Sequence, residues 1–330
     1  MKTYMVLGGN GVFGVQLVRY LLLKAPDVYV IAVGRNPEKP PAFSLHRGID
    51  DSRYEYHQIH IAYEPERLIE LLKAKQPSVV VNIAAQGEGA ASWKSSWRYF
   101  ETNAVALAKV VEPLIGAPWL KKWLQVGSSE VYGSVTAPAS EEAPIRPSSP
   151  YSASKAAADL YLLSVARSQN FPVNIIRPSN AYGPGQQLHR IIPKAVLCAL
   201  LGHKLPLQGG GTARKSYIHT DDLSRAIYWI AEKGHLGKVY NAGPKESTAI
   251  RTLVEIICEK TSVPFNQLVD LAPDRLGQDA QYLLDSSLIA KDLGWKPEIP
   301  LQDGINDVVI WAREHLEYLK KQPTNFTLRA

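Results

Sequence analysis

Short apolar runs rich in β-branched residues alternate with helical patterns through the first half of the chain. In order, they read TYMVLG, VFGVQLVRYLLLK, VYVIAVG, PERLIELLKAK and SVVVNIA. Strands and helices that alternate in this way form parallel sheets, because each helix carries the chain back to the edge where the last strand began. We therefore predict an α/β fold with a doubly wound parallel sheet covered by helices on both faces.

The alternation continues to about residue 178 and then becomes less regular. A helical pattern over residues 92–114, the strand KKWLQVGSS, a helix over about 151–170 and the strand VNIIRP complete the first half. Turns rich in Gly and Pro separate shorter helices after that. We predict a sheet domain over residues 1–178 and a smaller α/β domain over 179–330, with a segment near 213–240 that returns to the sheet.

The charge balance excludes several classes of protein. The chain of 330 residues holds 37 Lys and Arg against 31 Asp and Glu, a net charge of +6, but the basic residues are scattered singly or in pairs. Nucleic-acid-binding proteins instead gather them in a stripe. No apolar run reaches the length of a membrane span. We expect neither nucleic acid nor membrane as a partner, and the positive balance suits a small anionic substrate.

The cysteines and the N-terminus indicate the compartment. Cys198 and Cys258 each lie in an apolar helical pattern, which predicts two buried free thiols and a reducing environment. The opening MKTYMVLGGNG enters a strand and a Gly-rich turn at once, without the apolar stretch of a signal peptide. We expect a cytoplasmic protein. The eight histidines show no paired ligand spacing, so no metal site is expected.

A G-x-x-G-x-x-G pattern follows the first strand and opens the first helix. Backbone amides and the helix dipole at such a turn bind a pyrophosphate, so the pattern indicates a dinucleotide site. The residues of the turn expected to bind it are Gly8, Asn10, Gly11, Val12, Phe13 and Gly14. The alternative is a glycine triplet that only tightens the turn between strand and helix.

The second strand ends in Gly34-Arg35, where NAD enzymes usually place a carboxylate for the adenosine ribose. No carboxylate stands there. Arg35 instead offers a cation to the 2′-phosphate of NADP, or else it is a solvated surface arginine. We favour NADP over NAD as the cofactor.

Tyr151 and Lys155 are one helical turn apart at the start of a predicted helix. A nearby ammonium favours phenolate over phenol, which lowers the tyrosine pKa from about 10 towards that of a working base. The alternative is an exposed Tyr/Lys pair without a chemical role.

Further motifs follow the Gly-rich turn in one order along the chain. They are AAQ at 84–86, TN at 102–103, SSEVYG at 128–133, SPYSASK at 149–155 and RPSNAYGPGQ at 177–186. With them the chain resembles the extended short-chain dehydrogenase/reductases that act on nucleotide sugars, and it is most similar to the dTDP-glucose and GDP-mannose 4,6-dehydratase branch. The resemblance implies a Rossmann-type sheet that binds NAD(P), a C-terminal domain for the nucleotide sugar, and a homodimer.

The resemblance also assigns roles to the candidate catalytic residues. Tyr151 would be the base on the 4-hydroxyl of the sugar, Lys155 would hold the nicotinamide ribose and the phenolate, and Ser128 would hydrogen-bond the same oxygen. In the dehydratases the glutamate of SSEVYG removes the proton from carbon 5, a step that falls to Glu130 here. Further cofactor contacts implied by family position are Ala84, Ala85, Gln86 and Asn103.

One departure from the family leaves the reaction open. The dTDP-glucose 4,6-dehydratases carry Thr-Asp-Glu where this chain has Ser128-Ser129-Glu130, so the aspartic acid that would protonate the departing 6-hydroxyl is missing. The GDP-mannose enzymes have Thr-Ser-Glu, and related 4-keto-sugar reductases also show Ser-Ser-Glu. We predict a 4,6-dehydratase. A 4-epimerase and a 4-keto-sugar reductase are the alternatives, and a non-catalytic NAD(P) sensor is the remote one.

Family position implies contacts to the nucleotide sugar as well. The residues expected to make them are Asn180, Arg190, Arg214, Lys215, Asn241 and Arg275, with the choice between Arg214 and Lys215 at the phosphate left open. The third strand has His60 where the family usually contacts adenine through an aspartate, so His60 either substitutes for it or is only a strand-end polar residue. Trp93 and Trp97, at i and i+4, indicate core or subunit-interface packing rather than a sugar platform.

Overall fold

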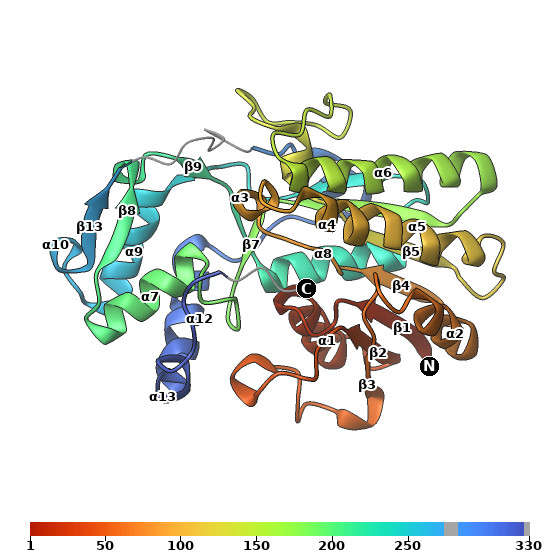
Figure 1. The fold of residues 1–330 in the computed structure, drawn as a ribbon, viewed down its shortest axis with the longest axis horizontal. Coiled ribbons are helices and arrows are strands. Elements are labelled where there is room, and N and C mark those ends of the chain that lie inside the picture. The colour runs from red at the N-terminus through yellow and green to blue at the C-terminus, as the bar shows by residue number, and fades with distance from the viewer. Residues whose placement is uncertain (274–282, 327–330) are drawn as a thin grey trace.

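The computed structural model describes residues 1–273 and 283–326. Its centre is a sheet of seven parallel strands in the order β11-β6-β5-β4-β1-β2-β3 (Figure 1). The strands are β1 (Lys2–Leu7), β2 (Val28–Gly34), β3 (Tyr54–Gln58), β4 (Val79–Asn82), β5 (Lys122–Val126), β6 (Val173–Pro178) and β11 (Val239–Ala242). The prediction of a doubly wound, Rossmann-type α/β fold is confirmed.

Helices cover both faces of this sheet because successive side chains of each strand point to opposite sides. Tyr4 and Val6 of β1 pack on one face, and Met5 and Leu7 pack on the other. The first face is covered by α1 (Val12–Lys24), α8 (Thr220–Lys233) and α11 (Ser287–Leu293). The second is covered by α2 (Pro65–Lys75), α5 (Ala106–Val111) and α6 (Pro150–Gln169).

The strand order reverses between β1 and β4, which are neighbours in the sheet although β2 and β3 come between them in sequence. The loops that leave these two strands run in opposite directions, so a crevice opens at their carboxyl ends. The Gly-rich turn follows β1 and the AAQ motif follows β4. Both motifs therefore meet at the same edge of the sheet.

Residues 217–242 belong to the sheet layer although they lie late in the chain. The helix α8 packs against α1 and β5, and β11 pairs with β6 as the edge strand. They are preceded by β10 (Tyr217–His219), which pairs with β7 (Asn180–Tyr182) just beyond β6.

A second, smaller body lies to one side of the sheet and has its own hydrophobic cluster (Figure 1). Its main helices are α7 (Ile191–Leu201), α9 (Ile250–Thr261) and α12 (Leu301–Glu314). Two short strand pairs complete it: β8 (Leu205–Gln208) with β13 (Val269–Ala272), and β9 (Arg214–Lys215) with β12 (Thr248–Ala249). This body faces the carboxyl edge of the sheet, so the crevice has a wall on each side.

The remaining elements are short. They are α3 (Gly89–Ser92), α4 (Ser96–Phe100), α10 (Phe265–Leu268), α13 (Leu316–Leu319), a π-helical stretch (Glu101–Val105) and 3₁₀ turns at Pro41–Phe43, Asp51–Arg53, Glu112–Leu114, Ser129–Tyr132 and Gly209–Gly211. The helix predicted over 92–114 is thus a run of α4, π-helix, α5 and a 3₁₀ turn.

Both cysteines are free thiols, and Cys258 is buried as predicted. The same prediction is wrong for Cys198, which is half-buried because it lies near the end of α7 with its sulfur 3.8 Å from the Lys204 carbonyl oxygen. None of the helices in residues 1–273 and 283–326 is long and apolar enough to cross a membrane.

Candidate active site

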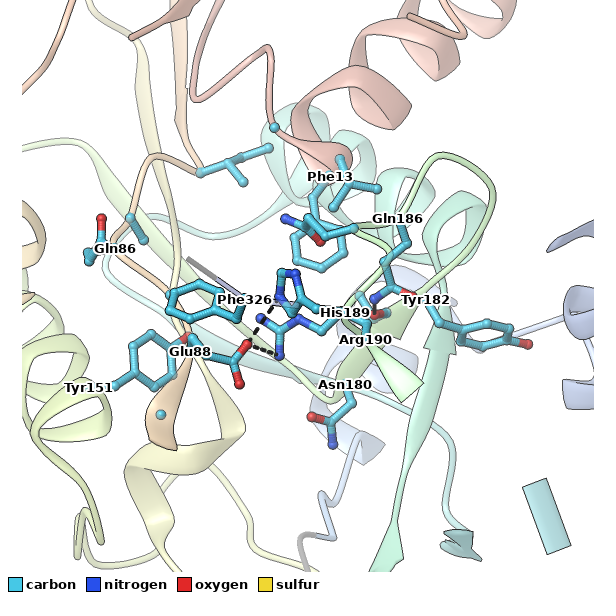
Figure 2. A pocket seen from close by; sticks show the side chains of 18 of the residues that line it. Phe13, Gln86, Glu88, Tyr151, Asn180, Tyr182, Gln186, His189, Arg190 and Phe326 are labelled. Atoms are coloured by element: carbon cyan, nitrogen blue, oxygen red, sulfur yellow. Dashed lines mark hydrogen bonds and ion pairs between the residues drawn. The ribbon is translucent and has the colours of Figure 1, made fainter. Parts of the chain in front are cut away.

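A cleft follows the carboxyl edge of the sheet and is closed on its far side by α7 and the segment after α13 (Figure 2). Among the described residues that line it, the acidic ones are Glu88 and Glu130, whereas Arg35, Lys39, Lys155, Arg190, Lys194 and Lys215 are basic. Excess positive charge in a confined groove attracts anions. The predicted site residues that line it are Gly8, Asn10, Gly11, Val12, Phe13, Arg35, Ala84, Ala85, Gln86, Ser128, Ser129, Glu130, Tyr151, Lys155, Asn180, Arg190 and Lys215.

The Gly-rich turn can only be built from glycine at its ends. Gly8 has a φ of +83°, and a Cβ there would lie 2.7 Å from the backbone nitrogen of Ala84. The N-cap of α1 is Gly11, which brings no side chain between the first amides of the helix and the cleft. Open amides at a helix N-terminus favour a phosphate group. The turn therefore fits the pyrophosphate of a dinucleotide.

Gly14 has a different role from the one expected. A Cβ on Gly14 would lie 2.2 Å from the Gly8 carbonyl oxygen. Because glycine has no Cβ, α1 can pack closely against the turn at this position. Gly14 is buried and is not among the described residues that line the cleft, whereas it was predicted to contact the cofactor directly.

The adenosine end of the cleft, as defined by the turn after β2, is basic. Arg35 and Lys39 both line it. The Asn10 side chain holds this turn in place, because its Nδ2 donates to the Pro37 carbonyl at 2.7 Å and its Oδ1 accepts from the Lys39 amide at 3.3 Å. His60 lines the same end, and burial lowers its pKa below the ordinary value, so the neutral imidazole is favoured.

Tyr151 lies in the first turn of α6, which a capping box holds in place. Ser149 Oγ accepts from the Ser152 amide at 3.1 Å, and Ser152 Oγ accepts from the Ser149 amide at 3.0 Å. Ser128, two residues beyond the end of β5, is close enough to the phenol to lower its pKa. The Tyr151 phenol of α6 and the Ser128 hydroxyl thus face the same part of the cleft.

Lys155 is 3% exposed, and its Nζ donates to the Val126 carbonyl at 2.6 Å. Burial lowers its pKa to about 8, and the Asp159 carboxylate one turn further along α6 opposes that shift. Burial and then the Glu130 carboxylate raise the pKa of Tyr151 above its ordinary value, whereas the Ser128 hydrogen bond lowers it. The lowering of the Tyr151 pKa by Lys155 that the spacing suggested is wrong here, because the ammonium is bound to a carbonyl.

A buried network lies behind Lys155. Arg177 Nε donates to Asp159 Oδ2 at 2.9 Å, and its Nη1 donates to the Tyr132 hydroxyl at 2.7 Å. The Tyr132 hydroxyl donates in turn to Asn241 Oδ1 at 2.8 Å. Asn241 is fully buried in this network, so its assignment as a substrate contact is wrong.

Asn103 holds the loop after β4 without lining the cleft. Its Oδ1 accepts from the Gln86 amide at 2.7 Å, and its Nδ2 donates to the Gln86 carbonyl at 3.1 Å and to Ser154 Oγ at 2.9 Å. The side chain is therefore used up in joining this loop to α6. Asn103, which was predicted to bind the cofactor directly, instead shapes the loop whose Gln86 lines the cleft.

Glu88, in the same loop, is a site residue that sequence reasoning missed. Its Oε2 lies 3.1 Å from Arg190 Nη1 and 3.4 Å from His189 Nε2 (Figure 2). The signal in the sequence was a lone carboxylate between two glycines directly after the AAQ motif. Phe326 was also missed: it lies in the cleft with its ring 5.1 Å from that of His189.

The predicted substrate cations divide between the cleft and the surface. Arg190, the N-cap of α7, and Lys215 both line the cleft. Arg214 instead donates from Nε to the Ser247 hydroxyl at 3.0 Å and is exposed, so of the adjacent pair Lys215 is the one that lines the cleft. Arg275 lies outside the described residues.

Trp93 and Trp97 are 68% and 59% exposed, so core packing is excluded for both, and Trp93 also reaches the cleft wall. In the part of the chain that the structure describes, no group of three or more His, Cys, Asp or Glu side chains is placed to hold a metal ion.

Comparison with known proteins points in one direction. Residues 4–243 match the model of the NAD dependent epimerase/dehydratase family. The dTDP-glucose 4,6-dehydratase of Streptomyces griseus is 32% identical over 324 residues, which cover 96% of this chain and 95% of that protein. The dTDP-glucose 4,6-dehydratase of Neisseria meningitidis is 29% identical, with 94% and 93% covered.

Solved structures agree with these sequence matches. A dTDP-glucose 4,6-dehydratase from Bacillus anthracis in complex with NAD superimposes with a TM-score of 0.87 at 29% identity, covering 96% of this chain and 98% of that one. A dTDP-glucose 4,6-dehydratase from Streptomyces venezuelae, also solved with NAD bound, gives 0.87 at 30% identity with the same coverage.

Proposed function

Since the chain belongs to the NAD dependent epimerase/dehydratase family, we propose that it is a nucleotide-sugar 4,6-dehydratase. The reaction oxidises carbon 4 of the hexose, eliminates water across carbons 5 and 6, and yields a 4-keto-6-deoxy sugar nucleotide. Residues 1–178 with the returning strand and helix would bind the cofactor, and the remainder of 179–330 would bind the nucleotide sugar.

The residues that would hold the dinucleotide are those of the Gly-rich turn, Arg35, the AAQ motif and Lys155. The bound nicotinamide would supply the hydride acceptor for the oxidation at carbon 4 and the hydride for carbon 6. The open amides of α1 and the close contact of Gly8 with Ala84 support this assignment, because both leave room for a pyrophosphate against the backbone.

Tyr151 would take the proton of the 4-hydroxyl. Ser128 lines the cleft beside the phenol and lowers its pKa, so it would hold the same sugar oxygen as charge develops there. Lys155 would turn its ammonium from the Val126 carbonyl to the nicotinamide ribose and the phenolate, which favours the deprotonated form of Tyr151.

Glu130 would remove the proton at carbon 5 once the ketone at carbon 4 has made it acidic. Glu130 lines the cleft, and its negative charge contributes to raising the pKa of Tyr151. Ser129, 4% exposed beside it, would offer a hydroxyl to the leaving group but no carboxylic acid. Within SSEVYG, Glu130 is thus the one group able to exchange protons with both carbon 5 and the departing 6-hydroxyl.

The observation that carries the proposal is the convergence of Tyr151, Ser128 and Glu130 on one cleft beside the Gly-rich turn. The test is incubation with UDP-, dTDP-, GDP- and CDP-hexoses in deuterated water. We expect one of them to lose 18 mass units of water and to gain deuterium at carbon 5.

Other outcomes of that experiment identify the alternatives. Inversion at carbon 4 without deuterium at carbon 5 identifies an epimerase. A 4-keto-sugar reductase would leave these hexoses unchanged, and it is identified by stoichiometric oxidation of added NADPH when a nucleotide 4-keto-6-deoxyhexose is supplied instead. A sensor without turnover would leave every hexose unchanged, and Tyr151→Phe would then alter no measured property.

We favour NADP as the finer choice of cofactor. Arg35 and Lys39 line the adenosine end, where the described lining residues include no carboxylate. Two cations suit a 2′-phosphate, whereas an acidic side chain would accept bonds from a free ribose hydroxyl. The relatives of known structure were solved with NAD, so the preference needs its own measurement.

We also propose a homodimer in the cytoplasm. The helices α4 and α6 pack side by side, and their outer surface, continued by the π-helical stretch, exposes Trp97, Phe100, Val105 and Leu160. A patch of this kind marks an interface. Two free thiols suit a reducing compartment.

A further inference from the structure

Glu88 has a backbone conformation that non-glycine residues seldom adopt. Its φ is +84° and its ψ is +88°, between Gly87 and Gly89 in the loop that leaves β4. The Tyr99 hydroxyl holds this backbone by donating to the Glu88 carbonyl at 3.0 Å. Such strain persists where the surroundings enforce it, and it is concentrated at ligand sites.

The strained backbone directs a carboxylate into the cleft. Figure 2 shows the Glu88 side chain between Tyr151 and Arg190, with ion pairs to Arg190 and His189. The loop also lies against Glu130, since a Cβ on Gly89 would be 3.4 Å from Glu130 Oε2. Glu88 therefore lies between the site of sugar oxidation and the cation assigned to the diphosphate.

We propose that Glu88 determines specificity by making tight binding of a nucleoside diphosphate depend on the attached sugar, an inference that rests on the function proposed above. A diphosphate on Arg190 displaces the Glu88 carboxylate from its cation and places two anions close together, which is unfavourable. An attached hexose lies over Glu88 and donates hydroxyl hydrogen bonds to it, and such bonds to a charged acceptor are strong. Free nucleoside diphosphate lacks this compensation.

The discrimination has a use in the proposed reaction. Nucleoside diphosphates share the base and both phosphates with the substrate, so contacts to those groups cannot tell the two apart. A carboxylate at the sugar position disfavours the ligand that lacks a sugar, since specificity is a difference of two affinities.

The test uses matched pairs of ligands: UDP with UDP-glucose, dTDP with dTDP-glucose, and GDP with GDP-mannose. Affinities are measured by calorimetry on the full chain carrying NADP or NAD, for the wild type and for Glu88→Gln, with Tyr151→Phe added to both so that no hexose is turned over. We expect the variant to bind the diphosphate of the preferred base roughly 2- to 5-fold more tightly, the range expected for a partly exposed ion pair. We expect it to bind the matching nucleotide hexose no more tightly than the wild type does.

One control variant and one double variant test whether the effect is specific to the Glu88–Arg190 pair. Glu70→Gln removes an exposed carboxylate from α2, away from the cleft, and should leave both affinities unchanged. Glu88→Gln combined with Arg190→Gln should lose the gain in diphosphate affinity. Thermal melting checks that each variant is folded, and Glu88→Ala repeats the measurement if the glutamine variant is unstable.

The inference is overturned if Glu88→Gln leaves the diphosphate affinity unchanged or weaker, or tightens both members of a pair equally. These binding results are independent of turnover. If a hexose loses water but the affinity ratio does not change, this inference fails and the dehydratase proposal remains. If the ratio changes as expected and no hexose loses water, the dehydratase proposal fails and the role of Glu88 remains.

Discussion

The Lys155 ammonium lies 2.6 Å from the carbonyl oxygen of Val126, the last residue of β5. The next residues along the chain are Gly127 and Ser128, and Ser128 lines the cleft beside Tyr151 and lowers the pKa of its phenol. One strand end thus positions both the lysine and the hydroxyl that complete the site around Tyr151.

Tyr151→Phe should lower the rate of water loss roughly 100- to 10,000-fold, the usual contribution of a positioned acid or base. The ring remains, so folding should be unaffected. Mass spectrometry of the product measures the rate. Tyr161→Phe, on the same helix, is the matched control and should retain full activity; equal losses in both variants would remove the base role from Tyr151.

The pH dependence of kcat/KM should reflect the protonation state of Lys155. Burial lowers its pKa to about 8, and the reaction needs the ammonium form, so kcat/KM should fall as the pH rises through about 8. The Asp159 carboxylate opposes this shift, so Asp159→Asn should move the fall to lower pH. Asp292→Asn, which breaks a 2.8 Å ion pair with Lys238, should not move the profile, and an unmoved profile in Asp159→Asn would contradict the assignment.

The lowered pKa of Lys155 should also make the free energy of unfolding depend on pH. The folded pKa of Lys155 is about 8 and lies below the ordinary lysine value of 10.5, so between these values the unfolded chain binds more protons than the folded one. The free energy of unfolding should therefore rise with pH across this window, by on the order of 1 to 3 kcal/mol. Urea denaturation at several pH values measures it. Lys155→Met should lack this part of the rise; a rise equal to that of the wild type would assign it to other groups.

Gly14→Ala should destabilise the Gly-rich turn. The added Cβ would lie 2.2 Å from the Gly8 carbonyl oxygen, so α1 must shift, at about 2 to 4 kcal/mol of unfolding free energy. Gly48→Ala adds a Cβ that meets nothing within 4 Å at a φ of +78°, so it carries only the backbone strain, about 1 kcal/mol. Equal losses in chemical denaturation would refute the packing role of Gly14.

Arg35→Ala should change the choice of dinucleotide. Loss of a cation beside the 2′-phosphate should weaken NADP binding roughly 10-fold or more and leave NAD binding nearly unchanged, because only NADP carries that group. Fluorescence titration with both dinucleotides measures the ratio. If the wild type already prefers NAD, or if the ratio does not move, the NADP assignment fails.

Trp97→Glu combined with Leu160→Glu should convert a homodimer to single chains, since charges on both helices would be buried in the interface. Sedimentation velocity measures the mass. Leu271→Glu changes a leucine that is 73% exposed on β13 and should leave the dimer intact. A wild-type protein that sediments as a single chain would end the dimer proposal.

The local patterns of the sequence determined the fold class and most of the site. Alternating strands and helices predict a parallel sheet wherever they occur, and the order of the motifs along the chain placed Gly8, Ser128 and Asn180 after strand ends that share one edge, with Tyr151 at the start of a helix. These predictions depend on spacing of a few residues, which the periods of strands and helices fix.

Only the tertiary structure decided which polar side chains face the cleft. Asn241 lies within the edge strand β11 and is used in a buried network, and Arg214 and Lys215 are adjacent yet only Lys215 lines the cleft. Glu88 and Arg190 are 102 positions apart in the sequence, and no local pattern predicts the ion pair between them. Burial and long-range pairing depend on how distant segments pack, and that information exists only once the chain has folded.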